Sequence, residues 1–402
     1  MPLPAGVYRA DHVGSFLRPK ALLAARETLN NTAQPTNSGE LRRLEDEHIA
    51  EVVRRQVDSG LRSVTDGEFR RAWFHIDFLQ HLAGVERQGN LASVNNNNNN
   101  NNAAGATSHG MTPPRLAVVG KISHPKPIQV DDFAFLARQV AAVTEDKTVS
   151  APLPITAKVC IPSPTMVHFR GGRDAISSSA YPSLEDDGFF ADLAAAYRAE
   201  LADLYAAGCR FVQLDDTNLA YLCDAQMAAA AAARHGGASA LQLARTYAAL
   251  INACVAGRPA DLVIGIHLCR GNYRSQWFAA GGYEPVAAVL FGELDVDVYF
   301  LEFDDERSGG FAPLRSLPAA KTAVLGLMSS KTPTLDDKGI VVARLKEAAR
   351  FCPRGLDQLC LSHQCGFSST EEGNELSEAE QWAKVRLEVE IAKEVWGPDL
   401  AV

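Results

Sequence analysis

The sequence lacks the features of a membrane or exported protein. Its apolar runs are short, and the alanine tract Ala228–Ala233 is typical of a helix rather than of a span of about 20 residues. The first residues, Met1–Gly6, contain no basic stretch followed by an apolar run, which argues against a signal peptide. We therefore expect a cytoplasmic protein with no membrane partner.

An excess of positive charge is also absent. The net charge is -9 and the pI is near 5.6, so the chain has no electrostatic reason to bind nucleic acid. Cysteine is sparse, with eight residues among 402. Without an export signal these residues should be reduced thiols, and a cysteine pattern then indicates a metal or catalytic site more often than cross-links.

Short apolar runs alternate with longer stretches of helical composition. The predicted strands are Tyr8–Val13, Arg62–Thr65, Ile155–Ile161, Phe211–Leu214, Val263–His267, Tyr299–Leu301, Ala323–Gly326 and Gln358–Leu361. The predicted helices include Glu40–Ser59, Phe189–Ala207, Ala238–Ala256, Pro285–Leu290, Gly339–Phe351 and Glu378–Val395, and glycines 60, 208 and 355 should end helices in a left-handed conformation.

This alternation predicts an α/β fold with parallel strands and right-handed crossovers. Eight units fit a (β/α)8 TIM barrel, and we expect residues 1–402 to form a single catalytic domain. The alternative is a doubly wound open sheet. That fold would be expected to carry a glycine-rich phosphate loop after its first strand, and neither G-x-G-x-x-G nor G-x-x-x-x-G-K-[ST] is found there.

One segment differs from the rest in composition. Ala92–Pro114 contains the asparagine run Asn95–Asn102 and is otherwise rich in Ala, Gly, Ser, Thr and Pro. Such a tract has no apolar face to bury, so we predict a disordered loop inserted in the domain. An insertion without function is its simplest explanation.

Metal-ligand residue types follow three of the predicted strands. His267 and Cys269 alternate at the end of one strand, so both side chains can bind one ion from the same side. Glu302 ends the next strand, and Cys365 lies just past the last one. A thiolate with an imidazole is typical of zinc sites, although a lone His-x-Cys pair is more often structural. The other six cysteines are predicted to pack in the interior.

Several motifs in fixed order resemble cobalamin-independent methionine synthase, and more closely its single-barrel relatives. They span the chain from Asp11-His12-Val13-Gly14-Ser15-Phe16, through Thr65–Arg71, Gln213–Asp216 and His267–Asn272, to Ser362–Phe367. The resemblance implies a zinc ion bound by His267, Cys269, Glu302 and Cys365. It also implies a homocysteine site, in which Val13, Gly14 and Ser15 hold the carboxylate and Glu68 and Asp215 the ammonium group.

The chain also departs from that pattern. The full-length synthases have a second, N-terminal barrel, for which this sequence has no room. They also have a histidine after the seventh strand that donates a proton to the folate nitrogen, whereas the corresponding stretch here, Gly326–Pro333, has none. Lys331, Asp304 and His363 are candidates to replace that catalytic acid, although the pKa of an ordinary lysine is too high for efficient proton donation at pH 7.

Two loops are candidates to bind the methyl donor. Arg270, Asn272, Arg274 and Trp277 follow the metal strand and suit an anionic or aromatic group, or else pair with acids in the loop. His168–Gly172, after the third strand, is a second donor-side candidate.

The sequence therefore predicts a Zn2+-dependent methyltransferase that moves a methyl group from a methylated pterin, a folate, to homocysteine and gives methionine. Three alternatives stay open: alkyl transfer to another small thiol, a zinc hydrolase, and a non-catalytic barrel with structural zinc. Residues equivalent to Ser15, Glu68 and Asp215 favour an amino-acid thiol, because they suit a zwitterion.

Overall fold

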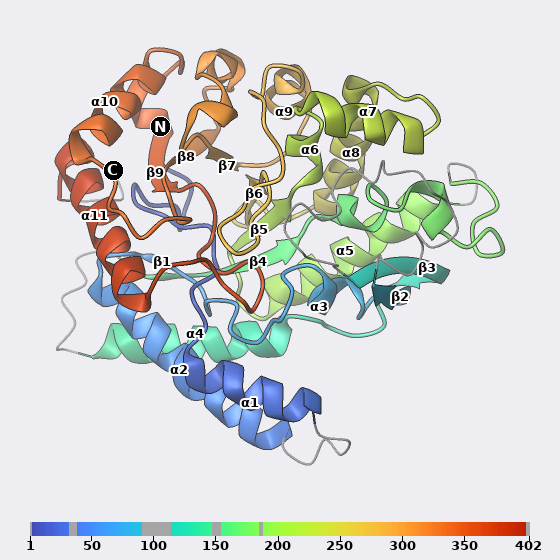
Figure 1. Ribbon diagram of the computed structural model, residues 1–402, viewed down its shortest axis with the longest axis horizontal. Helices are drawn as coiled ribbons and strands as arrows, with labels where there is room; N and C mark the ends of the chain where they lie inside the picture. Colours follow the sequence, from blue (N-terminus) through green and yellow to red (C-terminus); the bar gives the residue numbers. More distant parts are fainter. Residues whose placement is uncertain (1, 32–37, 91–113, 147–153, 185–187, 399–402) are drawn as a thin grey trace.

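Parallel strands lie at the centre of the molecule, and helices surround them (Figure 1). The computed structural model describes residues 2–31, 38–90, 114–146, 154–184 and 188–398. Seven strands form one parallel sheet in the order β1-β4-β5-β6-β7-β8-β9. Their bounds are β1 Ser63–Val64, β4 Thr156–Pro162, β5 Phe211–Asp216, β6 Val263–Leu268, β7 Val298–Glu302, β8 Thr322–Met328 and β9 Leu359–His363.

The segment Tyr8–Val13 occupies the eighth position and closes the sheet into a barrel. On one side, Ala10 forms a parallel bridge with Leu361 of β9. On the other side, the ring Nε2 of His12 lies 3.1 Å from the carbonyl oxygen of Ser63 in β1. The prediction of an α/β barrel is confirmed. The segment differs from a regular strand because β1 is only two residues long and a side chain makes its contact there.

Helices cover the outside of this barrel. The main ones are α1 Lys20–Asn31, α2 Ser38–Asp58, α4 Val130–Glu145, α5 Phe189–Ala206, α7 Ala225–Arg234, α8 Ala240–Val255, α10 Lys338–Ala349 and α11 Glu378–Trp396. Short helices are α3 Ile76–Leu79, α6 Asn218–Tyr221 and α9 Ala287–Gly292. In the described ranges, none of these helices has both the length and the apolar composition needed to cross a membrane.

Most predicted elements agree with the structure, but one hairpin was not foreseen. Strands β2 (Ala83–Asn90) and β3 (Pro114–Ser123) pair antiparallel beside the barrel. The strand β2 carries the consecutive polar residues Glu86, Arg87 and Gln88, so it lacks the alternation that indicates a strand. Residues 92–113 of the predicted loop lie outside the described residues, and Pro114 begins β3.

Alternate residues of each strand face the barrel interior. One buried cluster fills that interior and includes Phe211, Val263, Val298, Phe300 and Cys360. A larger cluster lies between the strands and the helices and takes the intervening residues, such as Ile264, Tyr299 and Leu361. This period of two decides which side chains at the strand ends point inward.

A buried ion pair lies within the barrel interior. The Nζ of Lys158 in β4 is 2.7 Å from Oδ1 of Asp11, and both side chains are fully buried. The same ammonium group lies 4.7 Å from the ring centroid of Phe300 and 5.5 Å from that of Phe211. Because Asp11 belongs to the closing segment, this pair ties the N-terminus to the second strand of the sheet.

Candidate metal and substrate site

Four potential metal ligands meet at the carboxyl ends of the strands. His267 lies in β6 and Cys269 just past it, Glu302 ends β7, and Cys365 lies two residues past β9. Their ligand atoms all lie within 4.8 Å of one another, and all four residues are buried. Residues 267, 269 and 302 follow the inward-facing register, since they lie an even number of positions beyond Val263 and Val298, which face the barrel interior. Cys365 lies past the end of β9, so strand alternation does not determine its direction.

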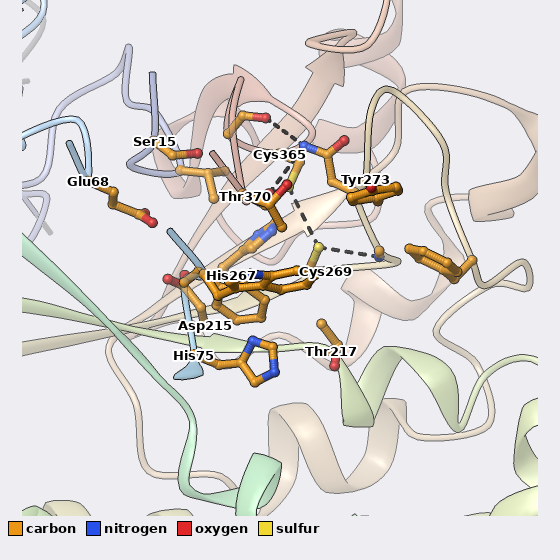
Figure 2. Close-up of a pocket in the computed structure, with 18 of the residues that line it drawn as sticks. Ser15, Glu68, His75, Asp215, Thr217, His267, Cys269, Tyr273, Cys365 and Thr370 are labelled. Carbon is orange, nitrogen blue, oxygen red and sulfur yellow. Dashed lines mark hydrogen bonds between the residues drawn. The ribbon is translucent and has the colours of Figure 1, made fainter. Parts of the chain in front are cut away.

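The two sulfur atoms of the cluster interact directly. The Sγ atoms of Cys269 and Cys365 are 3.6 Å apart (Figure 2). A hydrogen bond from Cys269 and the nearby His267 lower the pKa of Cys365 well below its usual value. The same interaction, together with burial, raises the pKa of Cys269. The pair therefore holds one thiolate readily and releases its second proton only when a cation compensates the charge.

The other two ligands are also placed for a cation. In the described part of the chain, neither ring nitrogen of His267 makes a hydrogen bond of ordinary geometry, although the ring is 2% exposed. Oε1 of Glu302 accepts the backbone N–H of Arg270 at 2.7 Å. Burial and the charge of Cys365 raise the pKa of Glu302 to about 7. Oε2 of Glu302 lies 3.5 Å from the guanidinium of Arg307, which compensates its charge in part. Two thiols, an imidazole and a carboxyl group, buried together, fit a zinc ion.

A pocket opens beside this cluster (Figure 2). Residues from many strand ends and loops line it. They include His267, Cys269 and Cys365 of the cluster, together with acidic residues, aromatic residues and one arginine. Besides these three, the lining residues are Val13, Ser15, Glu68, Trp73, Phe74, His75, Arg170, Asp215, Thr217, Tyr221, Gly271, Asn272, Tyr273, Phe278, Gly366, Ser369 and Thr370.

Two acids form one wall of the pocket. Carboxylate oxygens of Glu68 and Asp215 and the sulfur of Cys160 lie within 4.8 Å of one another. Burial, partly offset by Arg71, raises the pKa of Glu68 to about 7. Burial raises the pKa of Asp215 to about 6, although Gln213 donates a hydrogen bond to it at 2.7 Å. Arg71, 3.8 Å from Glu68, is a positive charge beside this pair and compensates the two acids only in part, so the pair suits an added ammonium group.

The turn at Gly14 and Ser15 lies next to these acids. Gly14 has a φ of +138°, and a Cβ there would lie 2.6 Å from the sulfur of Cys160 and 3.1 Å from Oε1 of Glu68. Only glycine therefore lets this turn approach the acid pair. The hydroxyl of Ser15 accepts the backbone N–H of Ser368 at 3.2 Å, which fixes the side chain at the pocket wall.

The loop after β6 contributes fewer residues than predicted. Asn272 lines the pocket, where Lys331 donates to its side-chain oxygen at 3.0 Å. Arg270 is not among the lining residues and is wholly buried, with its guanidinium 4.4 Å from the ring centroid of Tyr283. Trp277 is also outside the lining, and 43% of its surface is exposed. The structure places only Asn272 of these three where a pocket ligand can be contacted.

The three residues predicted as candidate proton donors, Lys331, Asp304 and His363, are not among the residues that line the pocket. Lys331 donates to the Gly271 carbonyl at 3.1 Å as well as to Asn272, and Asp304 accepts two hydrogen bonds from Arg307. His363 lies 2.7 Å from a carboxylate oxygen of Glu388 in α11, and burial lowers its pKa to about 3. The strand period explains this orientation, because Cys360 faces inward and residue 363, an odd number of positions further on, faces the helices.

Sequence reasoning missed the aromatic wall of the pocket. Trp73 and Phe74 follow the Thr65–Arg71 motif after one intervening residue, Tyr221 ends the short helix α6, and Tyr273 and Phe278 lie in the segment between β6 and α9. Loops carry no periodic pattern, so only the position of Trp73-Phe74-His75 next to a motif offered a signal.

The chain is similar to known proteins over nearly its whole length. The sequence profile described as the catalytic domain of cobalamin-independent synthase matches residues 9–394. Two uncharacterized proteins of Bacillus subtilis (strain 168), YxjG and YxjH, are each 40% identical to the chain and cover 97% of it and 95% of their own length. A 5-methyltetrahydropteroyltriglutamate–homocysteine methyltransferase of Thermosynechococcus vestitus is 31% identical over 43% of this chain and 19% of its own length.

Two solved structures are also similar. A Listeria monocytogenes protein, provisionally described as a vitamin-B12-independent methionine synthase, is 36% identical, with a TM-score of 0.71 over 99% of both chains. A B12-independent methionine synthase from Shewanella sp. W3-18-1, in complex with selenomethionine, has a TM-score of 0.67 over the whole of both chains. At 19% identity, this second likeness shows the fold alone.

Proposed function

The chain belongs to the family of cobalamin-independent synthase catalytic domains, and from this premise we propose that it transfers a methyl group to the sulfur of homocysteine, giving methionine. One observation carries the proposal: a single pocket is lined both by three members of the four-residue cluster, His267, Cys269 and Cys365, and by the acid pair Glu68 and Asp215. The first group suits a thiol-activating metal, and the second suits the amino end of the same substrate.

The chain's own residues would position and activate the thiol substrate. Glu68 and Asp215 hold its ammonium group, and the turn at Gly14 and Ser15 offers N–H and hydroxyl groups to its carboxylate. A zinc ion held by the four-residue cluster would supply the positive charge that keeps the substrate thiol deprotonated at neutral pH. Because the substrate is held at its amino-acid end and at its thiol, its sulfur is oriented toward the open side of the pocket.

The second substrate in this proposal is a methylated pterin. Its flat ring suits the aromatic wall of Trp73, Phe74, Tyr221, Tyr273 and Phe278. The carbon–sulfur bond forms as the bond between the methyl carbon and the pterin nitrogen breaks, and that nitrogen then takes up a proton. Either Lys331 or Asp304 would need to turn from its present partners to supply it.

Metal analysis of purified protein tests the proposed cluster. We expect about one zinc ion per chain in the parent, and loss of both zinc and methionine formation in Cys269→Ser and in Cys365→Ser. Cys352→Ser is the matched control, because Cys352 is a buried thiol outside the cluster. Full zinc content in either cluster variant would contradict the ligand assignment.

Assays of the parent protein test the substrates. Homocysteine and 5-methyltetrahydrofolate should give methionine, and saturating homocysteine should shift the zinc absorption edge toward added sulfur. An unchanged edge would contradict homocysteine as the thiol that binds next to Cys269 and Cys365.

A further inference from the structure

One residue that lines the pocket carries a positive charge without an ion-pair partner among the described residues. Arg170 follows β4, is exposed and lines the pocket. Within the described residues, no carboxylate lies at ion-pair distance from it. We infer that Arg170, with His75 beside it, forms a subsite for an anionic group of the methyl donor. This inference rests on the proposed function, because it assigns part of the second substrate's site.

The surroundings of Arg170 favour an anion. Its charge influences the pKa of three neighbouring groups, His75, Tyr221 and Arg234, and none of these is negative at neutral pH. The backbone before it is anchored, because the carbonyl oxygen of Phe169 accepts hydrogen bonds from Arg234 at 3.2 Å and from the ring of His235 at 2.9 Å. The guanidinium is therefore held near the pocket, and the described residues place no counter-charge beside it.

His75 supplies a second and independent observation. It is 4% exposed and lines the pocket, and its Nδ1 has no hydrogen-bond partner among the residues that the structure describes. Burial and the charge of Arg170 lower its pKa well below the usual value, so the ring is neutral at pH 7. A buried nitrogen without a partner is costly. An anion between the two side chains would accept from the imidazole N–H and neutralise Arg170.

The aromatic side chains next to the subsite define the rest of the ligand. The ring of His75 lies 4.6 Å from that of Phe74 and 6.4 Å from that of Trp73, measured between centroids. A ligand with an aromatic ring and a carboxylate or phosphate would contact both the aromatic side chains and the subsite formed by Arg170 and His75. The same anion would be repelled at the acid pair Glu68 and Asp215, so the pocket orients its two substrates in opposite senses.

Direct binding tests the subsite without the reaction. The probe is para-aminobenzoylglutamate, an aromatic dicarboxylate, titrated into the zinc-loaded protein by calorimetry. Arg170→Gln should weaken its binding by about tenfold or more, as expected for the loss of one charge-assisted hydrogen bond. His75→Gln should weaken it by about two- to fivefold, because a neutral hydrogen bond contributes less. Arg173→Gln removes the same charge three residues away, outside the lining, and should bind as the parent does.

Kinetics separate this inference from the proposed function. With 5-methyltetrahydrofolate, Arg170→Gln should raise the donor KM by a similar factor and leave kcat and the homocysteine KM nearly unchanged. Equal probe binding by the parent, Arg170→Gln and Arg173→Gln, or no binding by any of them, overturns the subsite. A parent that transfers no methyl group, yet loses the probe on Arg170→Gln, instead overturns the proposed donor and keeps the subsite.

Discussion

At the scale of single residues, the pocket holds buried ionisable groups that the described residues neutralise only in part. Glu68 has a φ of +59°, which is rare for a residue with a side chain, and its carboxyl group is buried beside that of Asp215. His267 and His75 likewise keep buried nitrogens without ordinary hydrogen bonds, as far as the described residues extend. Strain and missing partners concentrated in one pocket are typical of a functional site.

The raised pKa of Glu68 predicts a stability change with a definite sign. Its carboxyl has a pKa of about 7 in the folded chain and an ordinary value of 4.5, so folding takes up a proton and stability falls as pH rises from about 4.5 to about 7. Glu68→Gln removes this cost. Without substrate, its free energy of unfolding at pH 8 should exceed that of the parent by roughly 1–3 kcal/mol, and the gain should be smaller at pH 5.

Urea unfolding of the zinc-loaded protein at both pH values checks this prediction. The same variant should bind homocysteine more weakly, because the stabilised carboxamide cannot pair with an ammonium group. If the variant is less stable than the parent by the same amount at pH 5 and at pH 8, burial does not dominate the pKa of Glu68, and the prediction is wrong.

At the scale of elements, the period of the strands decided which predictions succeeded. The residue types at positions 267, 269, 302 and 365 were predicted to meet, and the structure brings them together. The inward register of β6 and β7 follows from alternation alone. The prediction of His363 as a proton donor does not agree with this alternation, because residue 363 of β9 points toward α11. Its outward direction could have been predicted from the sequence. The aromatic wall could not, because residues 73 and 273 lie in loops without a period and Tyr221 ends a helix of only four residues.

Strands β8 and β9 approach each other so closely at Gly326 that we expect this position to tolerate no side chain. A Cβ on Gly326 would lie 2.5 Å from Cα of Gln364 and 3.0 Å from its backbone nitrogen, where the ladder has a register shift. Backbone atoms cannot move aside cheaply. Gly326→Ala should destabilise the protein by about 1–3 kcal/mol and lower its zinc content, because Cys365 is the next residue.

Thermal unfolding and metal analysis measure both effects. Gly292→Ala is the control, because nothing lies within 4 Å of a Cβ at that position and its stability should be unchanged or slightly higher. Identical zinc content and stability in the two variants would refute the role assigned to this close approach.

At the scale of the whole molecule, the sequence predicted the barrel and seven of the eight strands within a few residues. The eighth, Tyr8–Val13, is a bridging segment, because a closing strand next to a two-residue β1 has little ladder to pair with. The hairpin β2–β3 was missed, and the disorder predicted for Ala92–Pro114 stays a prediction. The family resemblance is confirmed, while the substrates and zinc stay proposals.

The buried pair of Lys158 and Asp11 predicts how strongly the barrel depends on its closing segment. Lys158→Ala leaves Asp11 buried without its partner and should cost about 3–5 kcal/mol of unfolding free energy. The double variant Asp11→Asn, Lys158→Met should lose less than Lys158→Ala alone. Lys338→Ala, which removes exposed pairs with Glu390 and Glu394, should cost much less than Lys158→Ala, because water screens exposed pairs. Urea unfolding compares them, and equal losses for the buried and the exposed pair would contradict this account.

Closure of the barrel and completion of the proposed metal cluster both depend on residues near the C-terminal end of the sequence. The segment around Ala10 pairs with β9, and the last ligand, Cys365, comes only after β9. During translation, the earliest segment must therefore wait for almost the latest strand, while His267, Cys269 and Glu302 are already made. A nascent chain that stops before β9 lacks both the strand that pairs with Ala10 and the last candidate ligand, so neither the barrel nor the proposed metal cluster can be complete at that stage.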